Sequence, residues 1–212
     1  TVYTKYPQGG ERSLIYATTG RMVNSSMLPA DVNCVVNNID TVYAIYNAVE
    51  NKLPLTHRIV TVTGNAIANP QNFRVPIGTN LAELVDAAGG FTEQPEKIIS
   101  GGPMMGMALY NLNIPVTKGT SALLCFTGDE VKANEPSNCI NCGRCVSVCP
   151  GRIMPARLSV LAQNGDKEGF VALNGMECCE CGCCSYICPA KRHLTQAIKS
   201  MRKQVLADRK KK

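Results

Sequence analysis

The chain of 212 residues has no tryptophan, two histidines and only 5% aromatic residues. No stretch reaches the roughly 20 consecutive apolar residues of a transmembrane helix, so we expect any membrane association to be peripheral. The apolar fraction of 45% nevertheless supports a folded core and excludes a disordered chain. The first residue is Thr1 rather than methionine, within a segment that reads as structured, and this indicates a fragment.

The excess of positive charge is confined to the C-terminal end. The formal net charge is +6, and residues 199–212 carry all of it. No aromatic residues alternate with these basic residues to stack on bases, which argues against nucleic-acid binding. Two interpretations remain, a solvated helix end or contact with anionic lipid headgroups or an acidic protein partner. The basic residues are Lys199, Arg202, Lys203, Arg209, Lys210, Lys211 and Lys212.

Cysteine is abundant, with 12 residues, and most of them form two copies of one spacing. In each copy three cysteines are separated by two residues, and a fourth follows directly before proline. Each position of the second copy lies 39 residues after its counterpart in the first. This run is typical of proteins that hold two [4Fe-4S] clusters, so we predict an electron carrier. The copies are Cys139, Cys142, Cys145 and Cys149, and Cys178, Cys181, Cys184 and Cys188.

The cysteine before proline usually binds the other cluster in such proteins, so we predict crossed ligation. One cluster would then use the first cysteine set, which is Cys139, Cys142, Cys145 and Cys188. The other would use the second cysteine set, which is Cys149, Cys178, Cys181 and Cys184. Crossing ties the two halves together, and the loss of one cluster should therefore loosen the other.

Other uses of these cysteines fit less well. Structural zinc prefers two separated pairs of ligands, and a disulfide framework suits a small secreted chain with a signal peptide. Outside the two runs, Cys34 and Cys125 lie in apolar stretches and are expected to be buried. Cys179 and Cys183 lie beside ligands but outside the spacing, so we interpret them as bystanders.

The remaining pattern predicts a mixture of helices and strands. Apolar spacing indicates a helix over 42–49, with Asp40 or Thr41 as its N-cap, after a short buried strand at 32–36. Strands are expected at 58–63 and 72–77. Further helices are expected from Leu81 onward, capped by Asn80 with Glu83, over 155–163, and along a last stripe of Leu194, Ile198, Met201 and Val205.

Several segments, followed by the two cysteine runs, resemble the RnfC family, a component of the Rnf electron-transport complex, over essentially the whole chain. The resemblance implies a peripheral, cytoplasm-facing member of a bacterial inner-membrane assembly. That assembly couples electron exchange between ferredoxin and NAD to Na⁺ or H⁺ translocation and includes membrane subunits and a ferredoxin-like subunit. The matching segments are KYPQGGERSLI from Lys5, LPA from Leu28, VNNIDT from Val36, SGGPMMG from Ser100 and PVTKGT from Pro115.

The N-terminal segment is also similar to the flavin-binding subunit of respiratory complex I. This similarity implies flavin mononucleotide (FMN) contacts at Gly10, Glu11, Asn37, Asn38 and Thr41. The glycine-rich segment that supplies most of the flavin and NADH pocket in these relatives is absent from the chain. We therefore expect this fragment alone to lack full NADH activity, and no general acid or base is assigned.

The resemblance implies an α+β multi-domain architecture. Residues 1–53 would be the C-terminal part of an α/β FMN and NADH domain, and residues 54–112 a soluble-ligand-binding β-grasp (SLBB) module. Residues 113–135 would be a linker, 136–195 a ferredoxin-like domain with two [4Fe-4S] clusters, and 196–212 a basic helix or tail.

Three alternatives stay open at this point. A flavin and iron-sulfur cobalamin reductase of a bacterial microcompartment would share the same parts. A non-enzymatic ferredoxin-like carrier with a docking module would use the clusters without flavin. A purely structural metal protein would hold redox-silent metal.

Overall fold

The computed structural model describes residues 1–128 and 135–210, which form two compact units. Residues 1–37 and 135–210 make a helical unit, and residues 38–128 make a sheet unit. The expectation of an α+β chain is confirmed. Within the described residues, none of the helices combines the length and apolar character that crossing a bilayer requires.

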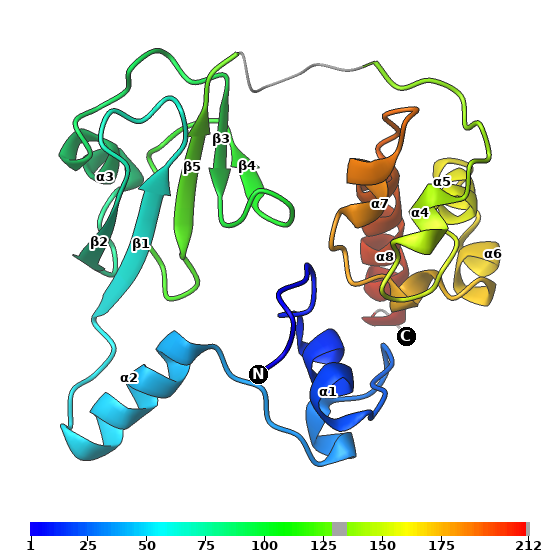
Figure 1. Ribbon diagram of the computed structural model, residues 1–212, viewed down its shortest axis with the longest axis horizontal. Helices are drawn as coiled ribbons and strands as arrows, with labels where there is room; N and C mark the ends of the chain where they lie inside the picture. The colour runs from blue at the N-terminus through cyan, green and yellow to red at the C-terminus, as the bar shows by residue number, and fades with distance from the viewer. Residues whose placement is uncertain (129–134, 211–212) are drawn as a thin grey trace. The chain divides into compact units, whose positions relative to one another are not determined.

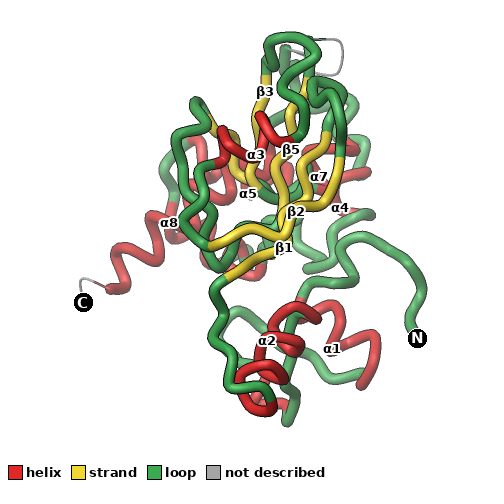
Figure 2. Tube along the Cα trace, turned by 90° about the vertical axis from the view of Figure 1, so that its left-hand side faces the viewer, coloured by secondary structure: helices red, strands yellow, loops and turns green. Residues whose placement is uncertain are grey.

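The sheet unit contains five strands in the order β2-β1-β5-β3-β4, which are labelled in Figure 1 and drawn in yellow in Figure 2. The strand pair β1·β5 is parallel, and the pairs β1·β2, β3·β4 and β3·β5 are antiparallel. The strands are β1 (His57–Thr63), β2 (Gln71–Pro76), β3 (Lys97–Ser100), β4 (Met107–Leu109) and β5 (Ala122–Phe126). The two strands expected from the sequence correspond to β1 and β2.

Helix α3 (Leu81–Ala87) packs on the sheet and closes its core. Its cap is the expected one, because the Asn80 side chain accepts a hydrogen bond from the Ala82 amide at 3.0 Å. Glu83 in turn accepts from the Asn80 amide at 3.1 Å, which completes the capping box. The buried residues of β1, β5 and α3 form one cluster that includes Val60, Val62, Leu81, Leu84, Val85, Leu123 and Cys125.

The expected linker at 113–135 is not a linker throughout, because it contains β5 at the centre of the sheet. The apolar run 122–126 pairs with β1 on one side and β3 on the other. In this central position Leu123 and Cys125 have no exposed surface. The expected burial of Cys125 is confirmed. Residues 129–134 of that expected linker lie outside the described residues.

The sheet unit begins with helix α2 (Ile39–Glu50), which confirms the helix expected at 42–49. Its N-cap is Asn38, not Asp40 or Thr41. The Asn38 side chain accepts a hydrogen bond from the Asp40 amide at 2.9 Å, and so the helix starts earlier than the apolar spacing indicates.

The N-terminal segment of the helical unit contains α1 (Glu11–Thr19) and a 3₁₀ turn, η1 (Pro29–Val32). The buried strand expected at 32–36 is wrong. Pro29 starts the 3₁₀ turn, Asn33 ends it with a positive φ of 54°, and Val35 is 87% exposed. Cys34 is only half-buried, so its expected burial is also wrong.

The rest of the helical unit consists of several short helices and one long C-terminal helix around a second core (Figure 1). Helices α5 and α8 pack on each other, and so do α4 and α7. The core contains Ile153, Leu158, Phe170, Met176, Ile198, Met201 and Val205. The buried residues of the last helix are Leu194, Ile198, Met201 and Val205, which confirms the predicted stripe. The elements are α4 (Arg144–Ser147), α5 (Pro155–Gln163), α6 (Lys167–Ala172), η2 (Gly175–Glu177), α7 (Cys183–Ile187) and α8 (Leu194–Lys210).

Candidate functional site

The backbone around the two cysteine runs repeats as closely as the sequence does. Three residues of the first run have a positive φ, and each has a counterpart 39 residues later with a positive φ. Positive φ is uncommon outside glycine, so its recurrence at matched positions shows that both runs fold into the same loop. The pairs are Asn141 and Glu180, Gly143 and Gly182, and Arg152 and Lys191.

The turns at the two cysteines before proline are also matched. The Cys149 amide donates to the Val146 carbonyl at 3.1 Å, and the Cys188 amide donates to the Ser185 carbonyl at 3.3 Å. Each cysteine carbonyl then accepts an amide three residues on, from Arg152 and Lys191, at 3.1 Å in both cases. Because α4 and α7 pack on each other, the two loops lie in one pseudo-symmetric arrangement.

The second cysteine set lines one cavity. Its four members, Cys149, Cys178, Cys181 and Cys184, all face this space, together with Cys179 and Cys183. Three of the four come from the second run, and Cys149 comes from the first. This is the crossed combination that the spacing predicts, and the four thiols are a donor set suited to a [4Fe-4S] cube.

The first cysteine set is more open. Cys142 is exposed, while Cys139, Cys145 and Cys188 are half-buried. Among the described residues, no group of three or more His, Cys, Asp or Glu side chains meets the geometry for holding one metal ion. A [4Fe-4S] cube binds each thiolate at a different iron, so its ligands lie further apart than those of a single ion. The use of the first set as a ligand set remains a prediction.

The thiols around the cavity lie in a weakly solvated environment. Burial raises the pKa of the Cys178 thiol to about 11, and burial also raises the pKa of Cys184. A hydrogen bond with Cys181 is the main cause that raises the pKa of Cys179. Metal binding requires thiolates, so binding of a cluster here would release protons.

Donors near these sulfur atoms are already in position. The Glu180 amide donates to the Cys178 sulfur at 3.4 Å, and the Thr195 hydroxyl lies 3.4 Å from the Cys184 sulfur. Hydrogen bonds to sulfur stabilise negative charge on a thiolate and influence cluster potential. The bystander interpretation of Cys179 and Cys183 stays a prediction, although both line the cavity.

The five residues expected to contact flavin lie at the starts of two helices. Gly10 is the N-cap residue of α1, and Glu11 is its first residue. Asn38 is the N-cap residue of α2, and Thr41 lies in the first turn of that helix. Gly10, Glu11 and Asn37 belong to the helical unit, and Asn38 and Thr41 belong to the sheet unit.

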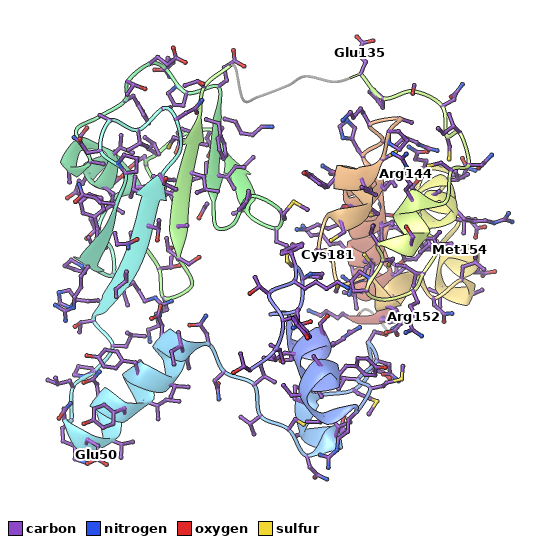
Figure 3. The ribbon with its side chains drawn as sticks, in the orientation of Figure 1. Glu50, Glu135, Arg144, Arg152, Met154 and Cys181 are labelled. Atoms are coloured by element: carbon purple, nitrogen blue, oxygen red, sulfur yellow. The ribbon has the colours of Figure 1, made fainter. Side chains whose placement is uncertain are left out.

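The cysteine pattern does not reveal two residues of the N-terminal segment that contact the second run or the residue before it. The Tyr6 hydroxyl donates to the Cys181 carbonyl at 2.6 Å, and Figure 3 shows Cys181 in the loop that precedes α7. Arg12 pairs with Glu177 at 3.1 Å. Burial is the main cause that raises the pKa of Tyr6, and the neighbouring thiols raise it further. The only sequence signal was the position of Tyr6 and Arg12 inside the motif KYPQGGERSLI.

The sheet unit has its own pocket, between α2 and β1. Arg58 and Arg74 line it with Tyr43 and Asn47. Arg58 pairs with Asp40 at 3.7 Å, and its Nε atom is buried without a hydrogen-bond partner. This pocket contains none of the expected site residues.

Matched loops and a cavity lined by cysteines of both runs are features of the class of iron-sulfur proteins. Comparison with protein-family models agrees with each part. The Nuo51 FMN-binding domain matches residues 1–47, the SLBB domain matches residues 59–108, and the 4Fe-4S binding domain matches residues 135–153.

Curated relatives identify the family. The chain is 46% identical over 211 residues to the C subunit of the Na⁺-translocating ferredoxin:NAD⁺ oxidoreductase complex of Acetobacterium woodii, covering 100% of this chain and 48% of the relative. It is 48% identical over 200 residues to the proton-translocating counterpart of Clostridium ljungdahlii, covering 94% of this chain and 44% of the relative. The chain belongs to the RnfC family of ion-translocating oxidoreductase complexes and spans about half the length of these relatives.

A third relative extends the similarity beyond these two organisms. The C subunit of the ion-translocating oxidoreductase complex of Rhodobacter capsulatus is 44% identical over 168 residues, covering 79% of this chain and 32% of the relative.

Proposed function

We propose that this chain transfers electrons between NAD(H) with FMN and ferredoxin, as part of a complex that couples this transfer to Na⁺ or H⁺ translocation. One observation carries the proposal. Cys149 from the first run lines the same cavity as Cys178, Cys181 and Cys184 from the second. In two-cluster ferredoxins the cysteine before proline ligates the cluster of the other run, and the position of Cys149 is consistent with that pattern.

The chain's own residues would hold the cofactors. The first and second cysteine sets would each ligate one [4Fe-4S] cluster, and Gly10, Glu11, Asn37, Asn38 and Thr41 would contact FMN. When bound, these groups exchange a hydride at flavin and single electrons at the cubes. The protein supplies thiolate ligands, sulfur-directed donors at Glu180 and Thr195, and burial of Cys181 and Cys184.

The proposed partners are the other subunits of the complex, including membrane subunits and a ferredoxin-like subunit, with NADH as substrate. We place the chain peripherally on the cytoplasmic face of the bacterial inner membrane. The C-terminal end of α8 supports contact with an anionic surface, because Arg209 and Lys210 lie in its last turn and are exposed. Lys211 and Lys212, which belong to the same basic end, lie outside the described residues.

The decisive experiment measures iron and acid-labile sulfide in anaerobically purified protein, with electron paramagnetic resonance (EPR) after dithionite reduction. We expect about eight iron and eight sulfide per chain, and two interacting cubane signals. Zinc without sulfide, or a silent spectrum, would contradict the proposal. The relatives' names favour this function over a cobalamin reductase, because each describes an ion-translocating oxidoreductase complex.

A further inference from the structure

We infer that the two clusters have different places in the electron path. The cluster of the second cysteine set is the flavin-side cluster, and the cluster of the first cysteine set faces the electron-transfer partner. This inference rests on the proposed function, because it assumes clusters at both sets and flavin beside Gly10 and Glu11. It assigns an order to the clusters, which neither the cysteine spacing nor the family similarity supplies.

The first observation is the contact between Tyr6 and the second run. The Tyr6 hydroxyl donates to the Cys181 carbonyl at 2.6 Å, across 175 residues of sequence. Tyr6 lies four residues before Gly10 and five before Glu11. The segment that would contact flavin is therefore hydrogen-bonded directly to the backbone of Cys181, a member of the second cysteine set.

The second observation is the ion pair between Arg12 and Glu177. Their side chains meet at 3.1 Å, and both are about one-third exposed, at 32% and 29%. Arg12 is the residue after Glu11, and Glu177 is the residue before Cys178. Each partner is thus the chain neighbour of a proposed cofactor contact, one for flavin and one for the cluster.

The N-terminal segment holds Glu177 at further points. The Ser25 amide donates to both carboxylate oxygens of Glu177, at 3.1 and 2.9 Å, and the Ser25 hydroxyl donates as well. Glu177 therefore receives donors from two separate parts of the segment, α1 and the loop that follows it. A contact made at several points fixes a distance better than a single exposed pair does.

The third observation is an asymmetry in burial between matched ligands. Cys181 is 7% exposed, whereas its counterpart Cys142 is exposed. Ile140, which follows Cys139, is an exposed apolar side chain with 67% of its surface accessible. The first loop is therefore open where the second is covered, as a site of electron exchange with another protein requires.

These observations indicate which cluster would receive electrons first, because electron tunnelling rates fall steeply with distance. Flavin bound at the N-terminal segment would lie beside the second cysteine set. Cys149, a member of that set, belongs to the loop of the first run, so the two clusters are neighbours. Electrons entering from NADH would then reach the second cysteine set first and the first cysteine set next.

The test uses Cys181→Ser and its matched control Cys142→Ser in the intact complex. NADH oxidation to NAD⁺ releases two electrons and one proton; each cluster takes one electron, and the proton passes to solvent. Rapid freeze-quench EPR follows each cluster after NADH addition, and a serine-ligated cube is recognised by its altered signal. Dithionite reduction of the same samples shows that both cubes are present.

We expect Cys142→Ser to slow NADH-driven reduction of the cluster of the first cysteine set more than that of the flavin-side cluster. Cys181→Ser should instead slow NADH-driven reduction of both clusters, while dithionite still reduces the cluster of the first cysteine set. The reverse pattern would overturn the order. If wild-type protein showed dithionite reduction but no NADH reduction of either cluster, the proposed function itself would fail and the order with it.

A second variant keeps the test independent of cluster assembly. Arg12→Gln removes the charge that pairs with Glu177 but alters no ligand. It should slow NADH-driven reduction of the flavin-side cluster by about tenfold, which is the usual size of the effect when a residue beside the metal ligands is changed. The spectrum of the dithionite-reduced protein should stay unchanged. The control Arg144→Gln alters a charge in α4, beside the first loop (Figure 3), and should preserve the rate of the flavin-side cluster. An unchanged rate in Arg12→Gln would contradict the inference.

Discussion

The carboxylate of Glu180 pairs with the guanidinium of Arg202, which joins the loop between two cysteines to α8. Lys199 from the preceding turn of the helix also pairs with Glu180, at 3.4 Å. Glu180 has a positive φ of 58°, and its own amide donates to the Cys178 sulfur. One residue therefore connects the backbone of the second loop, a ligand sulfur and the longest helix of the described chain.

Replacing Glu180 by asparagine should loosen this loop. Asparagine tolerates positive φ, and Asn141 occupies the matched position of the first loop, so the backbone conformation is preserved. The lost partner leaves the poorly exposed Arg202 uncompensated, and we expect a loss of about 1–3 kcal/mol in the local free energy of unfolding. Hydrogen exchange of residues 178–182 measures this loss. Glu168→Gln, on the exposed surface of α6, serves as the control, and equal exchange in both variants would contradict the prediction.

Replacing Cys188 by alanine should damage the cluster of the other run. If ligation is crossed, this variant loses a ligand of the first cysteine set, and the cube held with Cys139, Cys142 and Cys145 should degrade. Iron content and EPR after dithionite reduction report which cubane signal is lost. Cys179→Ala, a change beside a ligand but outside the spacing, should keep both signals. Damage limited to the cube of Cys178, Cys181 and Cys184 would show that ligation is not crossed.

Alkaline pH should destabilise the sheet unit through Cys125. Burial raises the pKa of the Cys125 thiol from 9.0 to about 11. Between these two pH values the Cys125 thiol is deprotonated in the unfolded chain and protonated in the folded chain. Its contribution to the free energy of unfolding is therefore fully present below pH 9 and is lost as the pH rises towards 11. The loss can reach about 3 kcal/mol, since each pKa unit corresponds to about 1.4 kcal/mol.

Hydrogen exchange of β5 amides, corrected for intrinsic rates, measures this effect between pH 8 and pH 10.5. In Cys125→Ala, the protection of β5 amides should change little from the value that this variant has at pH 8. Cys34→Ala, which changes a half-buried cysteine of the helical unit, should leave the dependence of β5 unchanged. A wild-type profile that stays flat over this range would refute the prediction.

Neutralising the end of α8 should weaken binding to anionic surfaces. Each basic residue near an anionic membrane contributes about 1 kcal/mol, so Arg209→Gln with Lys210→Gln should lower affinity for anionic vesicles by roughly 30-fold. Co-sedimentation with vesicles of anionic and of neutral lipid measures the difference. Substitution is preferable to truncation after Ala207, because Asp208 pairs with Lys167 at 2.6 Å. Iron content should stay intact; unchanged binding would identify this end as a solvated helix terminus.

Local sequence signals predicted several elements well. Asn80 and Glu83 predicted a capping box, and the structure has both of its hydrogen bonds. The helix predicted over 155–163 is α5 (Pro155–Gln163), because proline is favourable at the first position of a helix. These signals work because their partners are three or four residues apart and meet whenever the helix forms.

Elements that depend on distant partners were harder to predict. The apolar run 122–126 becomes a central strand only because β1 and β3 lie on either side of it. The apolar run 32–36 looks similar in sequence, but Pro29 starts a 3₁₀ turn and Val35 stays exposed. Apolar composition alone does not separate these two outcomes, since each depends on which segments lie alongside.

By itself the sequence determined the eight-cysteine repeat. Because each copy ends in a cysteine before proline, crossed ligation is the expected arrangement. A displacement of 39 residues is a property of the chain, and the two loops of the same spacing have positive φ at three matched positions. Only the tertiary structure decided that Cys149 shares a cavity with the second run, that Tyr6 contacts the same run, and that Arg12 pairs with Glu177, the residue before it. Those contacts join residues separated by up to 175 positions, and such distances close only when the helices pack around their common core.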